Sequence, residues 1–180
     1  MAIPTRAQLK KWAAAYVRLW NEGDRDGWAK NWLAVAPGDF TMWDPVGTPP
    51  KHGFQHCALD SFDLFQKRVR FHTPKETLFF NRGHVAWVMQ NHFEKDGKST
   101  YSNSIETFEF RDDGSVVIRT FYPVPAHDDE ALGDLFQVYL PTEKHGASRD
   151  HTSPKTWRTI RSMKSFAPSG GAGTAPAYTF

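Results

Sequence analysis

The sequence predicts an α+β fold in which helices come first and a sheet of antiparallel strands follows. Two observations carry this prediction: apolar residues recur at helical spacing near the start of the chain, and regularly spaced turn signals separate strand-like runs from about residue 75 onward. Helices followed by hairpin-connected strands are typical of α+β domains rather than of alternating α/β domains. The length of 180 residues fits one such domain.

Two helices are predicted before residue 37. Six apolar residues form one stripe at helical spacing: Leu9, Trp12, Ala13, Tyr16, Val17 and Trp20. Thr5 can cap the start of this helix, and Gly23 can end it. Asp24 can then cap a second, shorter helix, which is broken by the Pro37-Gly38 pair.

A short strand, a third helix and a meander are predicted next. The strand runs from Phe40 to Asp44 and is ended by Pro45, and the helix starts near Gly53. Turn signals at 81–83, 96–97 and 112–114 separate β-rich runs near 75–80, 84–94, 98–110 and 115–123. The helices can cover only one face of this sheet, so we expect a second copy of the chain to cover the other and form a homodimer.

The regular pattern ends near residue 124. We therefore expect a domain over residues 1–124 and a C-terminal extension over residues 125–180. Within the extension, Asp128 to Leu140 can form a further helix, and the stretch from Ser169 is a low-complexity tail.

Composition excludes several classes of function. Twenty-two basic and 20 acidic residues give a net charge of +2, which is too balanced for a protein that binds nucleic acid through its charge. A single cysteine, Cys57, excludes an internal disulfide and a cysteine-rich zinc site. The chain has no nucleotide-binding glycine motif, no His-Glu-x-x-His motif and no membrane-length apolar run, and its first residues lack the basic-then-apolar order of a signal peptide. We expect a cytoplasmic protein without cofactor, metal, nucleic acid or membrane as a partner.

Two stretches resemble a known enzyme family. The run from Tyr16 to Gly27, followed by Trp43-Asp44-Pro45-Val46-Gly47, resembles the ketosteroid isomerases of the NTF2-like or SnoaL-like superfamily. The resemblance continues at 105–110 and 114–117, and it covers roughly residues 5–123. It implies a cone-shaped α+β barrel, with three N-terminal helices packed on a curved antiparallel sheet.

The resemblance also implies roles for single residues. Asp44 stands where the family has its general base, and Tyr16 where it has a hydrogen-bond donor to the enolate oxygen. Glu106 stands at the position of a second, protonated acid, with one more methylene. If the sheet follows that of the family, the next strand would put Arg119 on the same face as Glu106, where it would keep that carboxyl ionised and unable to donate. The donor role would then pass to Tyr16, Arg119 or a histidine.

A second branch of the superfamily is also similar to this chain. The sequence His72-Thr73-Pro74 resembles the catalytic histidine region of the scytalone and bile-acid dehydratases, although Asn21 stands where that branch has an Asp. His72 would then donate a proton to a leaving hydroxyl. The candidate substrate-binding residues are Trp20, Phe62, Trp87, Met89, Asn91, Asn103, Phe108 and Phe121.

Three functions follow from these residues. The first is a cofactor-independent acid/base enzyme that moves a proton in a hydrophobic, ring-bearing small molecule, as an isomerase does. The second is a lyase that eliminates water or a small aldehyde. The third is a non-catalytic binding module, in which Asp44 is a turn residue, Tyr16 a core tyrosine, and Glu106 and Arg119 a structural ion pair.

Overall fold

The computed structural model describes residues 2–123 and 133–139. All of them lie in one structural unit, which extends from the N-terminus to residue 149. The predicted low-complexity tail, the second unit from residue 150 and most of the predicted extension lie outside the described residues. Of the helix expected over 128–140, the described part is helical and forms α4 (Gly133–Tyr139).

Two helices begin and end close to the predicted residues. α1 (Arg6–Glu22) starts at a capping box between Thr5 and Gln8 and is terminated by Gly23, whose φ of 73° lies in the left-handed region that favours glycine. α2 (Arg25–Leu33) starts where the Asp24 side chain accepts a hydrogen bond from a backbone N–H. The third helix has an unpredicted start, because the π-helical turn η1 (Gln55–Leu59) precedes α3 (Asp60–Phe65).

The strands form one sheet of seven. Their bounds are β1 (Phe40–Trp43), β2 (Lys51–His52), β3 (Arg70–His72), β4 (Phe79–Asn81), β5 (His84–Lys95), β6 (Lys98–Phe110) and β7 (Val116–Phe121), with the 3-10 turn η2 (Lys75–Thr77) between β3 and β4. The sheet order is β2-β1-β7-β6-β5-β3, and β4 also pairs with β5. The predicted meander is confirmed, but the sheet is mixed because β1 pairs with β7 in parallel.

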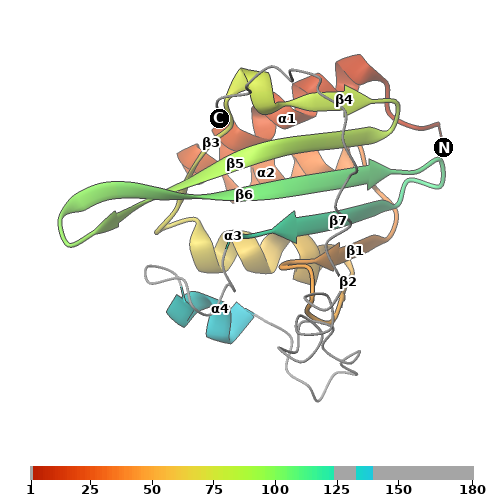
Figure 1. Ribbon diagram of the computed structural model, residues 1–180. Coiled ribbons are helices and arrows are strands. Elements are labelled where there is room, and N and C mark those ends of the chain that lie inside the picture. The colour runs from red at the N-terminus through yellow and green to blue at the C-terminus, as the bar shows by residue number, and fades with distance from the viewer. Residues whose placement is uncertain (1, 124–132, 140–180) are drawn as a thin grey trace, which may run out of the picture. The chain divides into compact units, whose positions relative to one another are not determined.

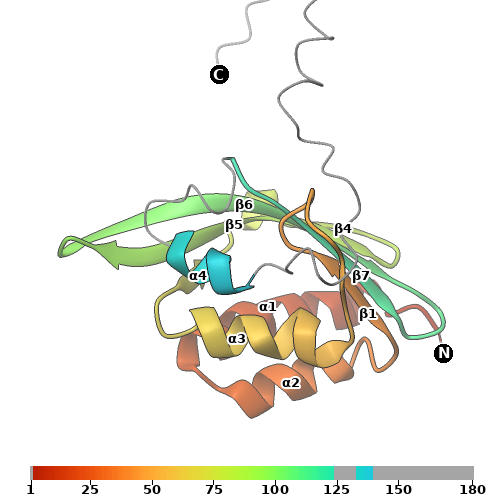
Figure 2. The ribbon, with the colours of Figure 1, turned by 90° about the horizontal axis from the view of Figure 1, so that it is seen from below.

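The sheet is curved and open, and the helices cover one of its faces (Figures 1 and 2). We call this helix-covered side the inner face and the opposite side the outer face. Figure 2 shows α4 next to α3 on the same side of the sheet as α1 and α2. None of the described helices is long and apolar enough to cross a membrane.

The core between the helices and the inner face is unusually aromatic. The ring of Trp12 on α1 stacks on that of Trp87 on β5, with centroids 5.4 Å apart, and meets the ring of Trp32 edge-on at 4.9 Å. Five tryptophans are almost fully buried: Trp12, Trp20, Trp28, Trp32 and Trp87. Large rings bury much apolar area, so they contribute strongly to stability and leave a rigid wall around any space between them.

Candidate active site

A cavity lies between the helices and the inner face of the sheet. Its volume is about 60 Å³, which is room for only a few water molecules. The lining residues are Tyr16, Trp20, Trp28, Trp32, Met42, Asp44, Cys57, Ser61, Phe65, Val69, Phe71, Asn91, Glu106, Phe108, Ile118, Thr120, Tyr122 and Phe136. The wall is therefore mostly apolar, with two carboxyl groups and two phenols among its few polar groups.

Asp44 directly follows β1 in the chain, and it lines this cavity. The Tyr122 hydroxyl donates a hydrogen bond to Asp44 Oδ1 at 3.2 Å, and the Tyr139 hydroxyl donates to Oδ2 at 2.8 Å. Burial, and then the negative charge of Asp44, raise the pKa of both phenols well above the usual 10. Both tyrosines therefore keep their protons and act as donors, while the carboxylate accepts.

Glu106 lies in the same cavity on β6 and is 8% exposed. Burial raises the pKa of its carboxyl to about 8, and the charge of Asp44 adds to the effect. The Trp87 indole N–H donates to Glu106 Oε2 at 2.8 Å. Because an indole can only donate, Oε2 must accept, and the Ser104 hydroxyl donates to Oε1 only at the long distance of 3.5 Å, so Oε1 is the oxygen that can carry the proton. At neutral pH, Glu106 is thus a neutral acid that can donate a hydrogen bond.

Tyr16 reaches the cavity from the inner side of α1. Its ring packs against Trp28, with centroids 4.3 Å apart, and against Trp87 at 5.0 Å. Its hydroxyl makes no hydrogen bond to any other described residue. Burial raises the pKa of this phenol well above 10, so the hydroxyl is a protonated donor that a ligand in the cavity can use.

The predicted pairing of Arg119 with Glu106 is wrong. In the register of β6 and β7, Glu106 lies opposite Thr120, so Thr120 is the residue that faces the cavity. Arg119 lies on the outer face, where it pairs with Glu109 at 3.7 Å and lies over the Trp43 ring at 5.5 Å. A difference of one residue in register reverses the face of every side chain on a strand.

His72 also lies outside the cavity, against the prediction. On β3, Phe71 lines the cavity while its neighbour His72 is exposed and contacts the His92 ring at 6.2 Å. Two other candidates, Asn103 and Phe121, are likewise exposed on the outer face. Their strands alternate between faces, and the neighbouring residues Ser104 and Thr120 are the buried ones.

The remaining candidates for substrate binding lie inside. Trp20, Asn91 and Phe108 line the cavity, whereas Phe62, Trp87 and Met89 are buried behind that lining. The Asn91 amide donates to Ser104 Oγ at 3.1 Å, and Ser104 Oγ in turn lies 3.5 Å from Glu106 Oε1. This chain of polar groups fixes the position of the buried acid.

The residues of the site that were not predicted include Thr120, Tyr122 and Tyr139. The first two continue the inward alternation of Ile118 on β7, so the correct register would have found them. Tyr139 follows Phe136 at helical spacing in the C-terminal extension, but no sequence pattern indicates that α4 packs at the cavity.

No group of three or more potential metal ligands occurs among the described residues. The thiol of Cys57 is buried, and burial raises its pKa to about 12, which disfavours the thiolate that a metal or an electrophile would need.

Comparisons with known proteins inform the fold. No family model and no curated protein matches the sequence. An epoxide hydrolase/cyclase-like enzyme, SalBIII, with a role in pyran ring formation in the polyether salinomycin, is 20% identical over 64% of this chain and 90% of its own, with a TM-score of 0.51. A de novo designed protein with a curved β-sheet is 17% identical over 75% and 99%, with a TM-score of 0.53.

The fold is NTF2-like. An LEH-like epoxide hydrolase of M. tuberculosis is also similar, at 17% identity over 75% of this chain and 98% of its own, with a TM-score of 0.48. One of these proteins is an enzyme and another is a design, so the NTF2-like fold by itself does not determine an activity.

Proposed function

We propose that this NTF2-like protein is a cofactor-independent acid/base enzyme with the cone-shaped fold of the ketosteroid isomerases, and that it moves a proton within a hydrophobic, ring-bearing small molecule. One observation carries the proposal: Asp44, a buried Glu106 whose pKa is raised, and a Tyr16 hydroxyl with no hydrogen-bond partner among the described residues line the same apolar cavity. Pairs of carboxyl groups with different ionisation states are typical of acid/base enzymes.

The chemistry assigns a role to each group. Asp44 takes a proton from a carbon next to a carbonyl and returns it to another carbon. The negative charge that develops on the carbonyl oxygen is stabilised by hydrogen bonds from Tyr16 and from Glu106 Oε1. The apolar wall excludes water, which strengthens these hydrogen bonds.

A second candidate function is the opening of an epoxide, which the enzymes of similar fold suggest. The neutral carboxyl of Glu106 favours it, because a carboxylic acid can protonate the epoxide oxygen while Asp44 activates a nucleophile. The lyase alternative has less support, since His72, its expected proton donor, is on the outer face.

Proton exchange into a ketone tests the proposed function directly. The protein in D₂O should incorporate deuterium next to the carbonyl of a cyclic ketone, and Asp44→Asn should slow this by about 10²–10⁴-fold. Asp39→Asn, an exposed acid five residues earlier, is the matched control and should exchange at the rate of the unmodified protein. Equal rates for Asp44→Asn and the unmodified protein would refute the role of Asp44.

Product masses separate the candidate reactions. With a panel of β,γ-unsaturated ketones, benzylic alcohols and epoxides, an isomerase leaves the mass unchanged, a lyase removes a small neutral molecule, and an epoxide hydrolase adds water. Binding of panel compounds without turnover or exchange would instead indicate a binding module.

A further inference from the structure

The side chain of Tyr139 contacts a carboxylate, an amine and an aromatic ring, which are groups of the kind that hold a ligand. Its hydroxyl donates to Asp44 Oδ2 at 2.8 Å, and the face of its ring lies 2.7 Å from Lys51 Nζ, measured to the ring centroid. The ring meets Phe65 edge-on at a centroid distance of 5.1 Å. One aromatic ring is thus held by a carboxylate at its hydroxyl, a cation at its face and an aromatic edge.

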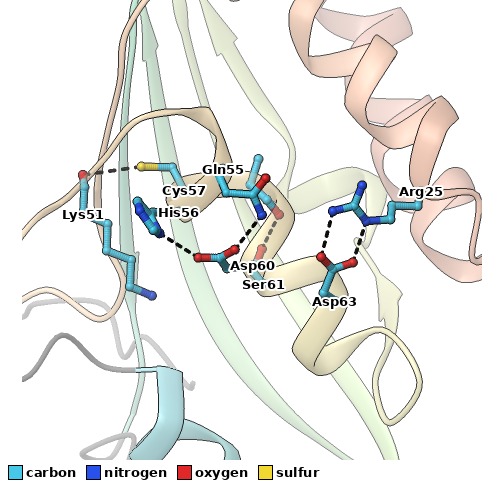
Figure 3. Close-up of polar contacts among 9 residues, drawn as sticks. Arg25, Lys51, Gln55, His56, Cys57, Asp60, Ser61 and Asp63 are labelled. Carbon is cyan, nitrogen blue, oxygen red and sulfur yellow. Dashed lines mark hydrogen bonds and ion pairs between the residues drawn. The ribbon is translucent and has the colours of Figure 1, made fainter.

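Among the described residues, the Lys51 amine has no hydrogen-bond acceptor, although the charge of Asp44 acts on it. It lies opposite Met42 in the pairing of β1 and β2, and Figure 3 shows its side chain extending toward α4. Its amine is buried and makes no hydrogen bond to a described residue. Burial lowers the pKa of this amine to about 8, so it is mostly charged at neutral pH. A buried cation without an acceptor is costly, and the ring face of Tyr139 offsets part of that cost.

Tyr139 also stands between two spaces. Asp44 lines the inner cavity of about 60 Å³, while Lys51 and Tyr139 line a groove of about 690 Å³ along α3 and α4. The Tyr139 side chain contacts Asp44, which lines the cavity, and Lys51, which lines the groove, so it connects the walls of the two spaces. The cavity alone is too small for a ring-bearing molecule, since ligand pockets usually have several hundred Å³.

We propose that the space filled by the Tyr139 ring is a binding subsite for a hydroxyl-bearing aromatic ring of the substrate, and that Tyr139 occupies it until such a ligand takes its place. The ligand hydroxyl donates to Asp44 and its ring lies over Lys51, as the tyrosine does. This deepens and rests on the proposed function, because it names the substrate class and puts its hydroxyl next to the proposed base.

Recognition depends on the hydroxyl as well as the ring. Asp44 can only accept hydrogen bonds, so a ring without a donor would leave Oδ2 buried and unpaired. A phenol satisfies that oxygen and the Lys51 ammonium together. The subsite should therefore prefer a phenol over an apolar ring of the same shape.

The test uses the full-length chain and two small probes. The first probe, p-cresol, has the structure of a tyrosine side chain, and the second, toluene, lacks its hydroxyl. Tyr139→Ala should bind p-cresol at least about 10-fold more tightly than the unmodified protein in calorimetry, because the competing ring is gone. Toluene should bind this variant about 10-fold or more weakly than p-cresol. Val138→Ala, at a neighbouring side chain that is 75% exposed, is the matched control and should leave both affinities unchanged.

Two further variants keep the test decisive. Tyr139→Phe preserves the packing but loses the bond to Asp44, so p-cresol should bind it a few-fold more tightly than the unmodified protein. Adding Lys51→Met to Tyr139→Ala should weaken p-cresol binding about 2- to 30-fold, the range of a buried cation–π contact. If p-cresol binds the tyrosine variants no better than the unmodified protein, or if toluene binds equally well, the subsite is refuted. These measurements need no turnover, so a failure of the proposed reaction would appear in deuterium exchange alone.

Discussion

Glu106 and Glu109 are three residues apart on β6, an odd spacing that places them on opposite faces of the sheet. Their carboxyl pKa values are shifted in opposite directions. On the inner face, burial raises the pKa of Glu106 to about 8. On the outer face, a hydrogen bond from Arg111 at 2.9 Å, helped by the charge of Arg119, lowers the pKa of Glu109. The same side chain is thus a neutral donor on one face and a charged acceptor on the other, which shows that the face, not the residue type, decides the chemistry.

The largest expected difference between the two acids is in catalysis. Glu106→Ala removes a donor to the developing oxyanion and should slow deuterium exchange into a cyclic ketone by about 10²–10³-fold. Glu106→Gln keeps a donor and should recover part of that loss. Glu109→Ala changes only the outer face, so its exchange rate should stay within about twofold of the unmodified protein. Equal losses in the two alanine variants would contradict the proposed role of Glu106.

The pH dependence of stability should have opposite signs for the two acids. Between its ordinary pKa of 4.5 and about 8, Glu106 keeps its proton in the folded protein but loses it on unfolding. The folded state therefore loses stability relative to Glu106→Gln as pH rises through this window, by up to about 1.4 kcal/mol per pH unit. Glu109, whose pKa is lowered, contributes stability that disappears as pH falls, and the effect is smaller because this acid is partly exposed. Urea unfolding from about pH 3 to about pH 8 covers both windows, and parallel curves for Glu106→Gln and the unmodified protein between about pH 5 and 8 would contradict the neutral acid.

The hydrogen bond from Trp87 also affects the ionisation of Glu106. This indole donor lowers the pKa of Glu106, so Trp87→Phe should raise that pKa and move the loss of stability to higher pH. The variant should also lose about 1–3 kcal/mol, because a buried acceptor is left without its donor. Trp20→Phe, which removes a bond to the Val69 carbonyl at 2.9 Å, is the matched control: it should lose similar stability without shifting the pH profile.

The smallest expected effect on stability concerns the outer face. Ile105 and Phe121 lie opposite each other in the β6–β7 register and are 51% and 43% exposed. We expect a second copy of the chain to cover this apolar pair, giving twice the 20.5 kDa of one chain in light scattering. Ile105→Lys should yield monomers with an unchanged fold. A mass of 20.5 kDa for the unmodified protein at micromolar concentration would exclude the dimer.

Much of the fold could be predicted because turns and caps have local causes. Gly23 ends α1, Asp96-Gly97 joins β5 to β6, and Gly114 leads into β7, each glycine with positive φ. The parallel pairing of β1 with β7 could not be predicted in this way, since it joins segments more than 70 residues apart.

In the candidate site, too, contacts between residues that are distant in the sequence could not be predicted. Asp44, Tyr16 and Glu106 were identified through family resemblance, and the structure brings all three to one cavity. Arg119 was assigned to the wrong face because the alternation of a strand gives two faces without saying which partner residue lies opposite. Tyr139 was missed because its contact with Asp44 spans 95 residues and has no local pattern.

The crowded indoles of the core give the protein a built-in optical probe. Five of the tryptophans surround or back the cavity, and their rings approach within about 5 Å of their neighbours. Trp43, by contrast, is only half-buried and lies beneath Arg119. A molecule that enters the cavity will change the emission and near-ultraviolet dichroism of the buried group, whereas a partner that contacts the outer face at Trp43 will change the signal of that ring. The spectrum of this chain can therefore report where a compound binds before its chemistry is known.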